Sequence, residues 1–451
     1  MIGKHLQHPA LGPCVVTKVI SAGEVEVSFP SLGMTGKRYR LAALIDPNTG
    51  DAPGNAPKID SSGPTLSGGP ALLSLEKTTL KARLAILALR LGQCPEDYID
   101  ELTVGAKDVK DACQWALDRS NEGKPAIVVF ESPFGKGKTH ALNLFSSMAR
   151  KQFRAVGSVV LDGIGISLTE PMTLLSNLSE SIRFPDGEGF ETLPERLCDL
   201  VQKGKAGTLR SRGAHFLANC LERVPREIAV QPDAWDIVVD YLSCNLPASQ
   251  AKQKLAAYRE HGGAPSLPAI VANRVDQRAP RCTMMLREWA QACTLAGAPR
   301  GLVVLFDEAD VDYGNTGFGQ KAVARRTLLY EAMRELAEDS DRSFLSMAIA
   351  ITPGQDNYWG EEAVSEILEN LGDECTRHVQ LGDLSKRDFV ELGKNVSALY
   401  AEAFGEEIYS PTEAADFARE LRDRMSSRVN DPCNPRRFIR EFIEHLDLAA
   451  M

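Results

Sequence analysis

The sequence predicts an α/β fold in which a parallel sheet is covered by helices, preceded by a small β-barrel and followed by a helical domain. Three observations predict it. From residue 72 onward, short apolar runs alternate with segments of helical period, which favours a parallel sheet buried on both faces. The first 46 residues read as short strands separated by turns, and the last 70 residues contain only helical patterns.

Composition narrows the class of protein. A chain of 451 residues is too long for one compact core, so we expect two or three domains. Its net charge of −10 argues against a surface that coats nucleic acid, although a local basic site is compatible with it. The ten cysteines have no metal-ligand spacing and are expected to be free thiols. Without an 18-residue apolar run or an apolar signal core, a cytoplasmic protein is expected, with no membrane contact.

Residues 1–47 are predicted to form a small barrel of the SH3 or Tudor type. The segment Glu-Val-Glu-Val-Ser-Phe at 24–29 alternates strictly, which is typical of a strand with one apolar face. A later strand carries Lys37, Arg38 and Arg40. These cations either protect a strand edge from aggregation or form a docking surface for DNA or a protein.

The rest of the chain is predicted to comprise a linker, a core and a lid. Nine of the 23 residues from Asn48 to Pro70 are Gly or Pro, so residues 48–71 are predicted to be a flexible linker. The predicted parts after it are a parallel-sheet core at 72–382, with a helical insertion at about 200–298, and a helical lid at 383–451.

A phosphate-binding loop is predicted after the apolar run Pro-Ala-Ile-Val-Val-Phe-Glu at 125–131. The loop reads Ser-Pro-Phe-Gly-Lys-Gly-Lys-Thr-His, and a helical segment follows it. The order strand, glycine loop, helix is the context that the motif GxxxxGK[ST] requires. Ser132 stands where the motif has its first glycine, and we interpret it as a tolerated departure because this position only begins the turn.

The other loop residues have the chemistry that binds a nucleoside triphosphate. Gly135 and Gly137 allow backbone amides to approach the phosphates closely. Lys138 is expected to neutralise the β- and γ-phosphates, and Thr139 to bind Mg²⁺. The predicted ATP-binding residues are Ser132, Pro133, Phe134, Gly135, Lys136, Gly137, Lys138, Thr139 and His140. Among these, His140 is expected to pack or cap locally rather than to catalyse.

An acidic pair follows a second buried strand, in the segment Gly-Leu-Val-Val-Leu-Phe-Asp-Glu-Ala-Asp at 301–310. Carboxylates at the end of such a strand are costly unless they hold an ion or perform chemistry. We predict that Asp307 completes the Mg²⁺ site and that Glu308 is the general base for the attacking water. The alternative is a helix N-terminus with solvated acids, and no catalytic role is assigned to Asp310.

Thr352 ends a further apolar strand at 343–354. In a sheet where the strand of Asp307 neighbours the loop strand, Thr352 can orient the water or the γ-phosphate. Asn357 is the second choice for this role. The alternative for Thr352 is that it only starts a Thr-Pro turn.

Two arginines are candidates for stabilising charge on the transferred phosphoryl group. Arg377 comes just before a fifth strand, from where it can reach the nucleotide of a neighbouring subunit in a ring. Arg436 opens the last helix and can sense the γ-phosphate, with Arg437 as its competitor. Arg325 and Arg326 are weaker candidates. The alternative for each arginine is a surface or ion-pair role.

Together these motifs resemble AAA+ P-loop ATPases, and the final segment is similar to the lid of the origin-recognition and initiator branch. A narrower resemblance, to the ATP-binding proteins of bacterial BREX-type phage-exclusion systems, covers about residues 75–451. The segments that carry it are 86–109, 131–142, 301–310 and 434–447. That family has Tyr-Gly-Ser-Gly-Lys-Thr-His in the loop, from which Phe134 and Lys136 depart.

The resemblance implies a Mg²⁺-dependent ATPase in antiviral defence, acting beside helicase or DNA-modifying partners. A homo-oligomer is expected, and DNA is a further candidate partner. The rival hypothesis is a slow-turnover adaptor or switch, whose N-terminal barrel reads DNA or a protein. A DNA translocase is less well supported, because the sequence has no series of helicase motifs and no strongly basic groove.

Overall fold

The computed structural model describes the backbone of four short N-terminal strands and most of residues 70–450. The gaps after residue 70 are 186–191, 259–264, 273, 317–318, 339–342, 354–359 and 427–433. Side chains are described from residue 78, with wider gaps at 314–318, 337–342 and 354–362. The chain forms two compact units, Met1–Leu72 and Leu73–Met451. The linker predicted at 48–71 lies outside the described residues, except for residues 70 and 71.

The smaller unit contains a four-stranded antiparallel sheet in the order β1-β2-β3-β4. Its strands are β1 (His5–His8), β2 (Gly12–Ser21), β3 (Glu24–Phe29) and β4 (Met34–Arg40). Register shifts interrupt both the β2–β3 and the β3–β4 pairings. Such bulges bend a sheet and increase its twist. Closure of this sheet into a barrel stays a prediction.

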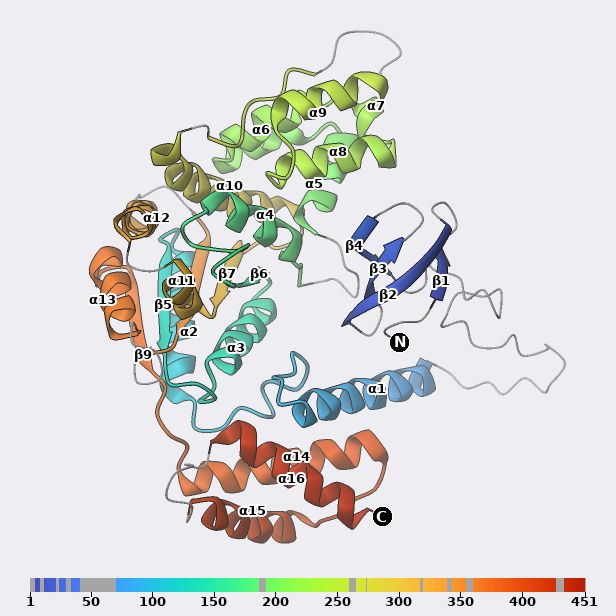
Figure 1. The fold of residues 1–451 in the computed structure, drawn as a ribbon, viewed down its shortest axis with the longest axis vertical. Coiled ribbons are helices and arrows are strands. Elements are labelled where there is room, and N and C mark those ends of the chain that lie inside the picture. The colour runs from blue at the N-terminus through green and yellow to red at the C-terminus, as the bar shows by residue number, and fades with distance from the viewer. Residues whose placement is uncertain are drawn as a thin grey trace, which may run out of the picture. The chain divides into compact units, whose positions relative to one another are not determined.

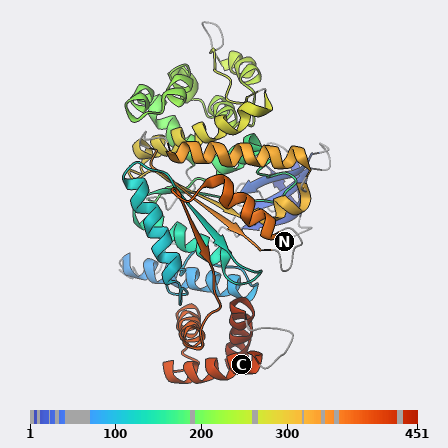
Figure 2. The ribbon, with the colours of Figure 1, turned by 90° about the vertical axis from the view of Figure 1, so that its left-hand side faces the viewer.

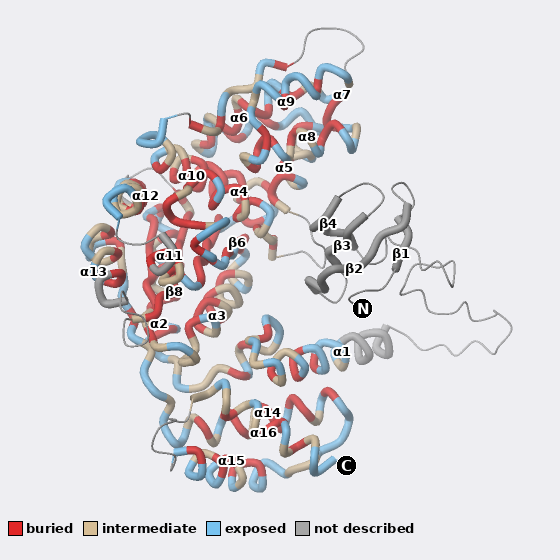
Figure 3. The backbone as a smooth tube through the Cα atoms, in the orientation of Figure 1, coloured by how far each residue is buried: buried red, intermediate tan, exposed pale blue. Residues whose placement is uncertain are grey.

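The larger unit is built on a five-stranded parallel sheet in the order β6-β7-β8-β5-β9. The strands are β5 (Ala126–Glu131), β6 (Ala155–Val160), β7 (Leu302–Asp307), β8 (Leu345–Ile351) and β9 (Thr376–Gln380). Every residue of β7 and β8 is buried, as Figure 3 shows, which is the environment that continuous apolar runs favour. The predicted α/β class with a parallel sheet is confirmed.

The strand order corrects one expectation. The sequence suggested that the strand of Asp307 neighbours the loop strand, and this is wrong because β8 lies between them. Phe130 of β5 is opposite Ala350, and Phe306 of β7 is opposite Ile349. Apolar runs identify buried strands but carry no information on which strands pair. Because β8 lies between β5 and β7, the last residues of β8 lie between the loop and the acidic pair.

Helices cover both faces of the sheet (Figure 1), and alternate residues of β5 point to the two layers. Val128 and Phe130 pack with α2 (Lys107–Asn121) and α3 (Lys138–Lys151). Ile127 and Val129 belong to the larger cluster on the other face. The helices of that cluster include α4 (Pro171–Ser181), α10 (Arg278–Ala296), α12 (Gln320–Glu338) and α13 (Gly360–Leu371).

A lobe of helices separates α4 from α10. It contains α5 (Leu193–Gln202), the 3₁₀ helix η3 (Ala206–Arg212), α6 (His215–Leu221), α7 (Arg226–Ala229), α8 (Pro232–Leu242) and α9 (Ala248–Leu255). Glu288 of α10 is buried, and its carboxylate accepts the amides of Phe216 and Leu217 at 2.8 and 2.5 Å. The carboxylate therefore caps α6 and fixes the lobe to α10.

The lid lies at the other end of this unit (Figure 2) and consists of α14 (Lys386–Phe404), α15 (Pro411–Ser426) and α16 (Pro435–Ala449). Ser385 and Asp388 form a capping box at the start of α14. Asn434 accepts the Arg437 amide at 2.8 Å and caps α16. The helix α1 (Pro70–Arg90) packs in the same apolar cluster as the lid helices, through residues such as Ile86 and Leu89.

Two further findings concern the described part of the chain. None of its helices combines the length and apolar character needed to cross a membrane. The eight cysteines whose side chains are described are free thiols, as the sequence indicated.

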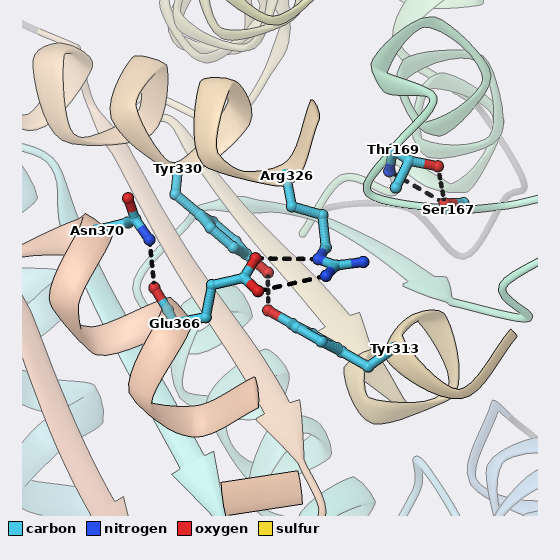
Figure 4. A network of polar contacts seen from close by, with 7 residues as sticks. All are labelled: Ser167, Thr169, Tyr313, Arg326, Tyr330, Glu366 and Asn370. Carbon is cyan, nitrogen blue, oxygen red and sulfur yellow. Dashed lines mark hydrogen bonds and ion pairs between the residues drawn. The ribbon is translucent and has the colours of Figure 1, made fainter. Parts of the chain in front are cut away.

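A buried polar network joins three helices behind the sheet (Figure 4). Arg326 of α12 is fully buried and pairs with Glu366 of α13 at 3.0 Å. Its guanidinium lies 4.0 Å from the ring centre of Tyr313, on α11 (Ala309–Thr316). The hydroxyls of Tyr313 and Tyr330 are 2.9 Å apart. The Glu366 carboxylate and the Tyr313 ring stabilise the buried guanidinium of Arg326. Because this guanidinium is buried and already paired, Arg326 is not placed to contact a nucleotide, and we exclude it as a catalytic arginine.

Replacing Glu366 with leucine should lower the free energy of unfolding by about 3–5 kcal/mol, because Arg326 would stay charged and buried without its partner. Urea unfolding followed by tryptophan fluorescence measures this change. The matched variant Glu391→Leu removes an exposed partner of Lys394 and should leave the midpoint nearly unchanged. Equal midpoints for the two variants would contradict the prediction.

Candidate functional site

A cavity of about 820 Å³ opens at the carboxyl ends of β5, β7 and β8. The phosphate-loop residues Phe134 to Ala141 form one wall, and residues of the α1–α2 connection and of the lid form others. Pockets of 300–1,000 Å³ are typical of small-ligand sites. The cavity therefore has room for a whole nucleotide, at the edge of a parallel sheet where such ligands bind.

The loop has the backbone that its glycines predicted. Gly135 and Gly137 have φ of 78° and 102°, in the left-handed region that side chains disfavour. Ser132 is buried, and its amide donates to the Ile351 carbonyl at 3.2 Å. This bond anchors the start of the loop to the end of β8. The serine side chain donates to the Pro133 carbonyl at 3.3 Å and stays within the turn.

Lys138 is held at the mouth of the loop. Its ammonium donates to the carbonyls of Ser132 and Pro133, at 2.9 and 3.4 Å. Burial lowers its pKa, and the carboxylates of Asp310, Asp307 and Glu308 act in the opposite direction. Because α3 begins at Lys138, the free amides of its first turn adjoin the cavity, an arrangement that favours anions.

Thr139 and Asp307 meet across the cavity floor. The Thr139 hydroxyl donates to the Asp307 carboxylate at 2.7 Å, and the other carboxylate oxygen accepts the Glu308 amide at 2.9 Å. A hydroxyl and a carboxylate are hard oxygen ligands of the kind that Mg²⁺ prefers. The described residues contain no group of three His, Cys, Asp or Glu side chains placed to hold a metal. Mg²⁺ would therefore need phosphate and water oxygens as well, which is its usual manner of binding beside ATP.

Glu308 lines the cavity directly after Asp307. Its φ is 57°, an unfavourable value for a residue with a side chain, at the junction where β7 ends and α11 begins. Strained backbone of this kind gathers at functional sites. Partial burial and the carboxylates of Asp307 and Asp310 raise the pKa of Glu308, which makes it a stronger base.

Thr352 is buried beside the same cavity, and its amide donates to the Asp310 carboxylate at 3.0 Å. Asp310 thus joins the end of β8 to the first turn of α11. The sequence reasoning gave Asp310 no role. Its position three residues after Asp307 was a usable signal, because it places a third carboxylate near the same strand end. Asn357 lies outside the described residues.

His140 is half-buried in the first turn of α3, where desolvation lowers its pKa to about 4. Its Nε2 is 2.8 Å from the Thr103 hydroxyl, and its Nδ1 is 3.5 Å from the Cys94 sulfur. Since the Thr103 hydroxyl donates to the Ile99 carbonyl, the Nε2 hydrogen of His140 is donated to Thr103. The ring therefore ties α3 to the α1–α2 connection, in agreement with a local packing role.

Arg436 is the lid arginine that faces the cavity. Its Nε donates to the Gly92 carbonyl at 2.6 Å, and its guanidinium lies 5.7 Å from the ring centre of Phe134. Its competitor Arg437 pairs with Glu441 at 2.8 Å. Lys136, in the loop, forms an ion pair with Asp383.

Arg377 does not line this cavity. It lies within β9 rather than before it, paired in register with Val128, and its guanidinium is 4.7 Å from the ring centre of Trp115. Its side chain is exposed at the edge of the sheet. Arg325 instead pairs with Glu170, which also pairs with Arg278. Neither Arg377 nor Arg325 is placed to touch a nucleotide bound in the same chain.

The comparisons with known proteins agree with this geometry. A search of curated proteins found no match. The sequence matches the family described as BREX system ATP-binding protein BrxC/D over residues 79–183 and 269–451. The matched segments contain the loop, the acidic pair and the lid, and they omit 184–268, which includes α5–α9. The match covers more than half of the chain and confirms the resemblance found in the sequence. The chain therefore belongs to the family of BREX system ATP-binding proteins BrxC/D.

Proposed function

We propose that this protein is a Mg²⁺-dependent ATPase that couples ATP binding and hydrolysis to a partner protein or DNA during phage defence. The family supports ATP binding and the BREX context. The observation that carries hydrolysis is the 2.7 Å contact between Thr139 and Asp307, with Lys138 and Glu308 beside the same cavity. The oxygens that could bind a cation, the ammonium that could neutralise phosphate and the candidate base therefore all lie beside the same cavity.

The triphosphate is bound by the loop amides and by Lys138. In this proposal the Lys138 ammonium exchanges the carbonyls of Ser132 and Pro133 for phosphate oxygens. Thr139 would hold Mg²⁺ directly and Asp307 would hold it through water. The metal, when bound, would neutralise phosphate charge.

Hydrolysis requires an oriented water and a base. Glu308 would accept the proton of the attacking water, and its raised pKa suits that step. Thr352, fixed by Asp310, would orient the water or the γ-phosphate. Arg436 would contact the triphosphate from the lid, and closing of the lid would exclude water from the site.

A slow-turnover switch is the second candidate, and the position of Arg377 favours it for the isolated chain. Of the two arginines predicted to stabilise transition-state charge, only Arg436 lines the cavity. A single subunit would then bind ATP and hydrolyse it slowly. In a homo-oligomer, Arg377 of one subunit would complete the site of the next, which converts the switch into an ATPase.

Replacing Glu308 with glutamine should lower kcat about 10²- to 10⁴-fold and leave the ATP affinity within about twofold, because only proton acceptance is removed. Phosphate release and titration calorimetry measure the two quantities. Lys138→Ala should weaken both ATP binding and turnover. Unchanged turnover in Glu308→Gln would refute the base assignment.

The variant Thr139→Ala should need a much higher Mg²⁺ concentration for half-maximal hydrolysis, since it lacks a metal-binding oxygen. Thr139→Ser keeps that oxygen and should behave like the unaltered protein in the same Mg²⁺ titration. Asp307→Asn should resemble Thr139→Ala. If all three variants gave the unaltered Mg²⁺ dependence, these two side chains would not hold the metal.

Complementation between two inactive variants tests whether Arg377 acts on a neighbour. Arg377→Ala and Glu308→Gln should each hydrolyse ATP slowly alone. Their mixture should regain activity, because an intact Glu308 then meets an intact Arg377 across an interface. Phosphate release at equal total protein measures the effect. A mixture no faster than the average of its components would place Arg377 outside catalysis.

A further inference from the structure

Charge is segregated within the lobe that the family match omits. Residues 203–226 contain six Lys or Arg residues and one acidic residue, in a chain whose net charge is −10. The cations are Lys203, Lys205, Arg210, Arg212, Arg223 and Arg226, and all six are exposed. We call this set the basic turn. Such an excess is unexpected for an ordinary solvated surface of an acidic protein.

Two adjacent turns bring most of these cations together. Arg226 lies directly over Gly204, where an added Cβ would be only 1.6 Å from its guanidinium nitrogen. Gly204 has a φ of 65°, and it separates Lys203 from Lys205 in the chain. Arg210 pairs with Glu222 at 2.6 Å, which places η3 beside the turn between α6 and α7. The positive φ and missing Cβ of Gly204 thus let Arg226 lie against the turn that carries Lys203 and Lys205.

Three of the cations are not neutralised by the described residues. The side chains of Lys205, Arg212 and Arg226 make no hydrogen bond or ion pair with any part of the chain that the structure describes. Lys203 pairs with Asp199, but both side chains are about 60% exposed, so solvent screens this pair. These groups are free to exchange water for an external anion.

A separate group of acidic residues lies on α8. Asp233, Asp236 and Asp240 follow one another on α8, and all three are exposed. The pKa of Asp236 is raised by burial and by the neighbouring carboxylates of Asp233, Asp240 and Glu195. These carboxylates therefore repel each other.

We propose that the basic turn is a docking surface for the phosphate backbone of duplex DNA. Several unneutralised, exposed cations match a polyanion, whose counterions they displace. The aromatic residues of the segment are His215 and Phe216, and the centre of the Phe216 ring lies 4.9 Å from the guanidinium of Arg281. The segment therefore has no series of rings on which successive unpaired bases could stack. Contacts to phosphates alone carry no sequence information, so binding is non-specific.

The lobe is also connected to the nucleotide site. Glu288 fixes α6 to α10, and α10 leads within a few residues into β7, which ends at Asp307. DNA held at the basic turn is therefore attached through one helix to the strand of the metal-binding carboxylate. This surface extends the proposed function, and it can be tested without any hydrolysis.

The test uses the full-length protein and a fluorescein-labelled 30-bp duplex of mixed sequence. Fluorescence anisotropy gives the affinity at a series of NaCl concentrations. The triple variant Lys205→Glu, Arg212→Glu, Arg226→Glu should bind at least about 10-fold more weakly at low salt. Its slope of log K against log salt should be smaller in magnitude by about 2–3, since each lost phosphate contact removes about 0.9.

A matched control reverses three exposed cations of the lid, Lys386, Lys394 and Arg419, and changes the net charge equally. It should bind the duplex like the unaltered protein, and calorimetry should show that both variants bind ATP. Equal losses in the two triple variants would overturn the proposal. So would tighter binding of a 30-nucleotide single strand than of the duplex.

An electrostatic contact between copies is the competing outcome. The acidic α8 of one molecule could receive the basic turn of another. Light scattering measures the oligomeric state of both triple variants. If the unaltered protein binds no duplex and the basic-turn variant changes only the oligomeric state, the surface joins copies of the chain and the DNA proposal fails.

Discussion

The contact between Thr139 and Asp307 is the constraint on which the nucleotide site depends. The two residues are 168 positions apart in the chain. Thr139 lies on α3, which follows β5, Asp307 ends β7, and β8 separates these two strands. The 2.7 Å hydrogen bond between the two residues requires that β5, β8 and β7 end at the same level. The apolar packing of the sheet therefore sets the geometry of the polar site. The Ile351 carbonyl of β8 accepts the Ser132 amide, and the Thr352 amide just after β8 donates to the Asp310 carboxylate. A shift in the register of β8 would displace both sides of the site together.

Much of the fold follows from local pattern. Apolar runs predicted β5, β7 and β8, and the helical patterns of the last 70 residues agree with α14, α15 and α16. The phosphate loop and the acidic pair could be recognised because each depends on a short segment with fixed spacing. Pairing order could not be recognised, because β7, β8 and β5 all read as continuous apolar runs and any of them could be central. The position of β8 therefore required the structure.

Roles that depend on tertiary neighbours were also beyond sequence pattern. Arg325 and Arg326 are adjacent in the chain, yet one pairs near the surface and the other is buried between Glu366 and Tyr313. Arg436 and Arg437 differ in the same way, since one lines the cavity and the other pairs along its own helix. Asp310 was passed over because its partner, the Thr352 amide, comes from a strand 42 residues later. Adjacent residues on a helix point in different directions, so tertiary packing decides which of the two side chains lines the cavity.

The packing of α1 has a mechanical consequence. Ile86 and Leu89 belong to the apolar core that holds α14, α15 and α16 together, so α1 and the three lid helices pack as one block. The chain enters this block at Pro70, and everything before it is attached there. A rotation of the block on nucleotide binding would therefore swing the anchor point of the first 69 residues. If the proposed function holds and the lid closes on ATP, the segment that leads to the small antiparallel sheet would start from a point that moves with the lid.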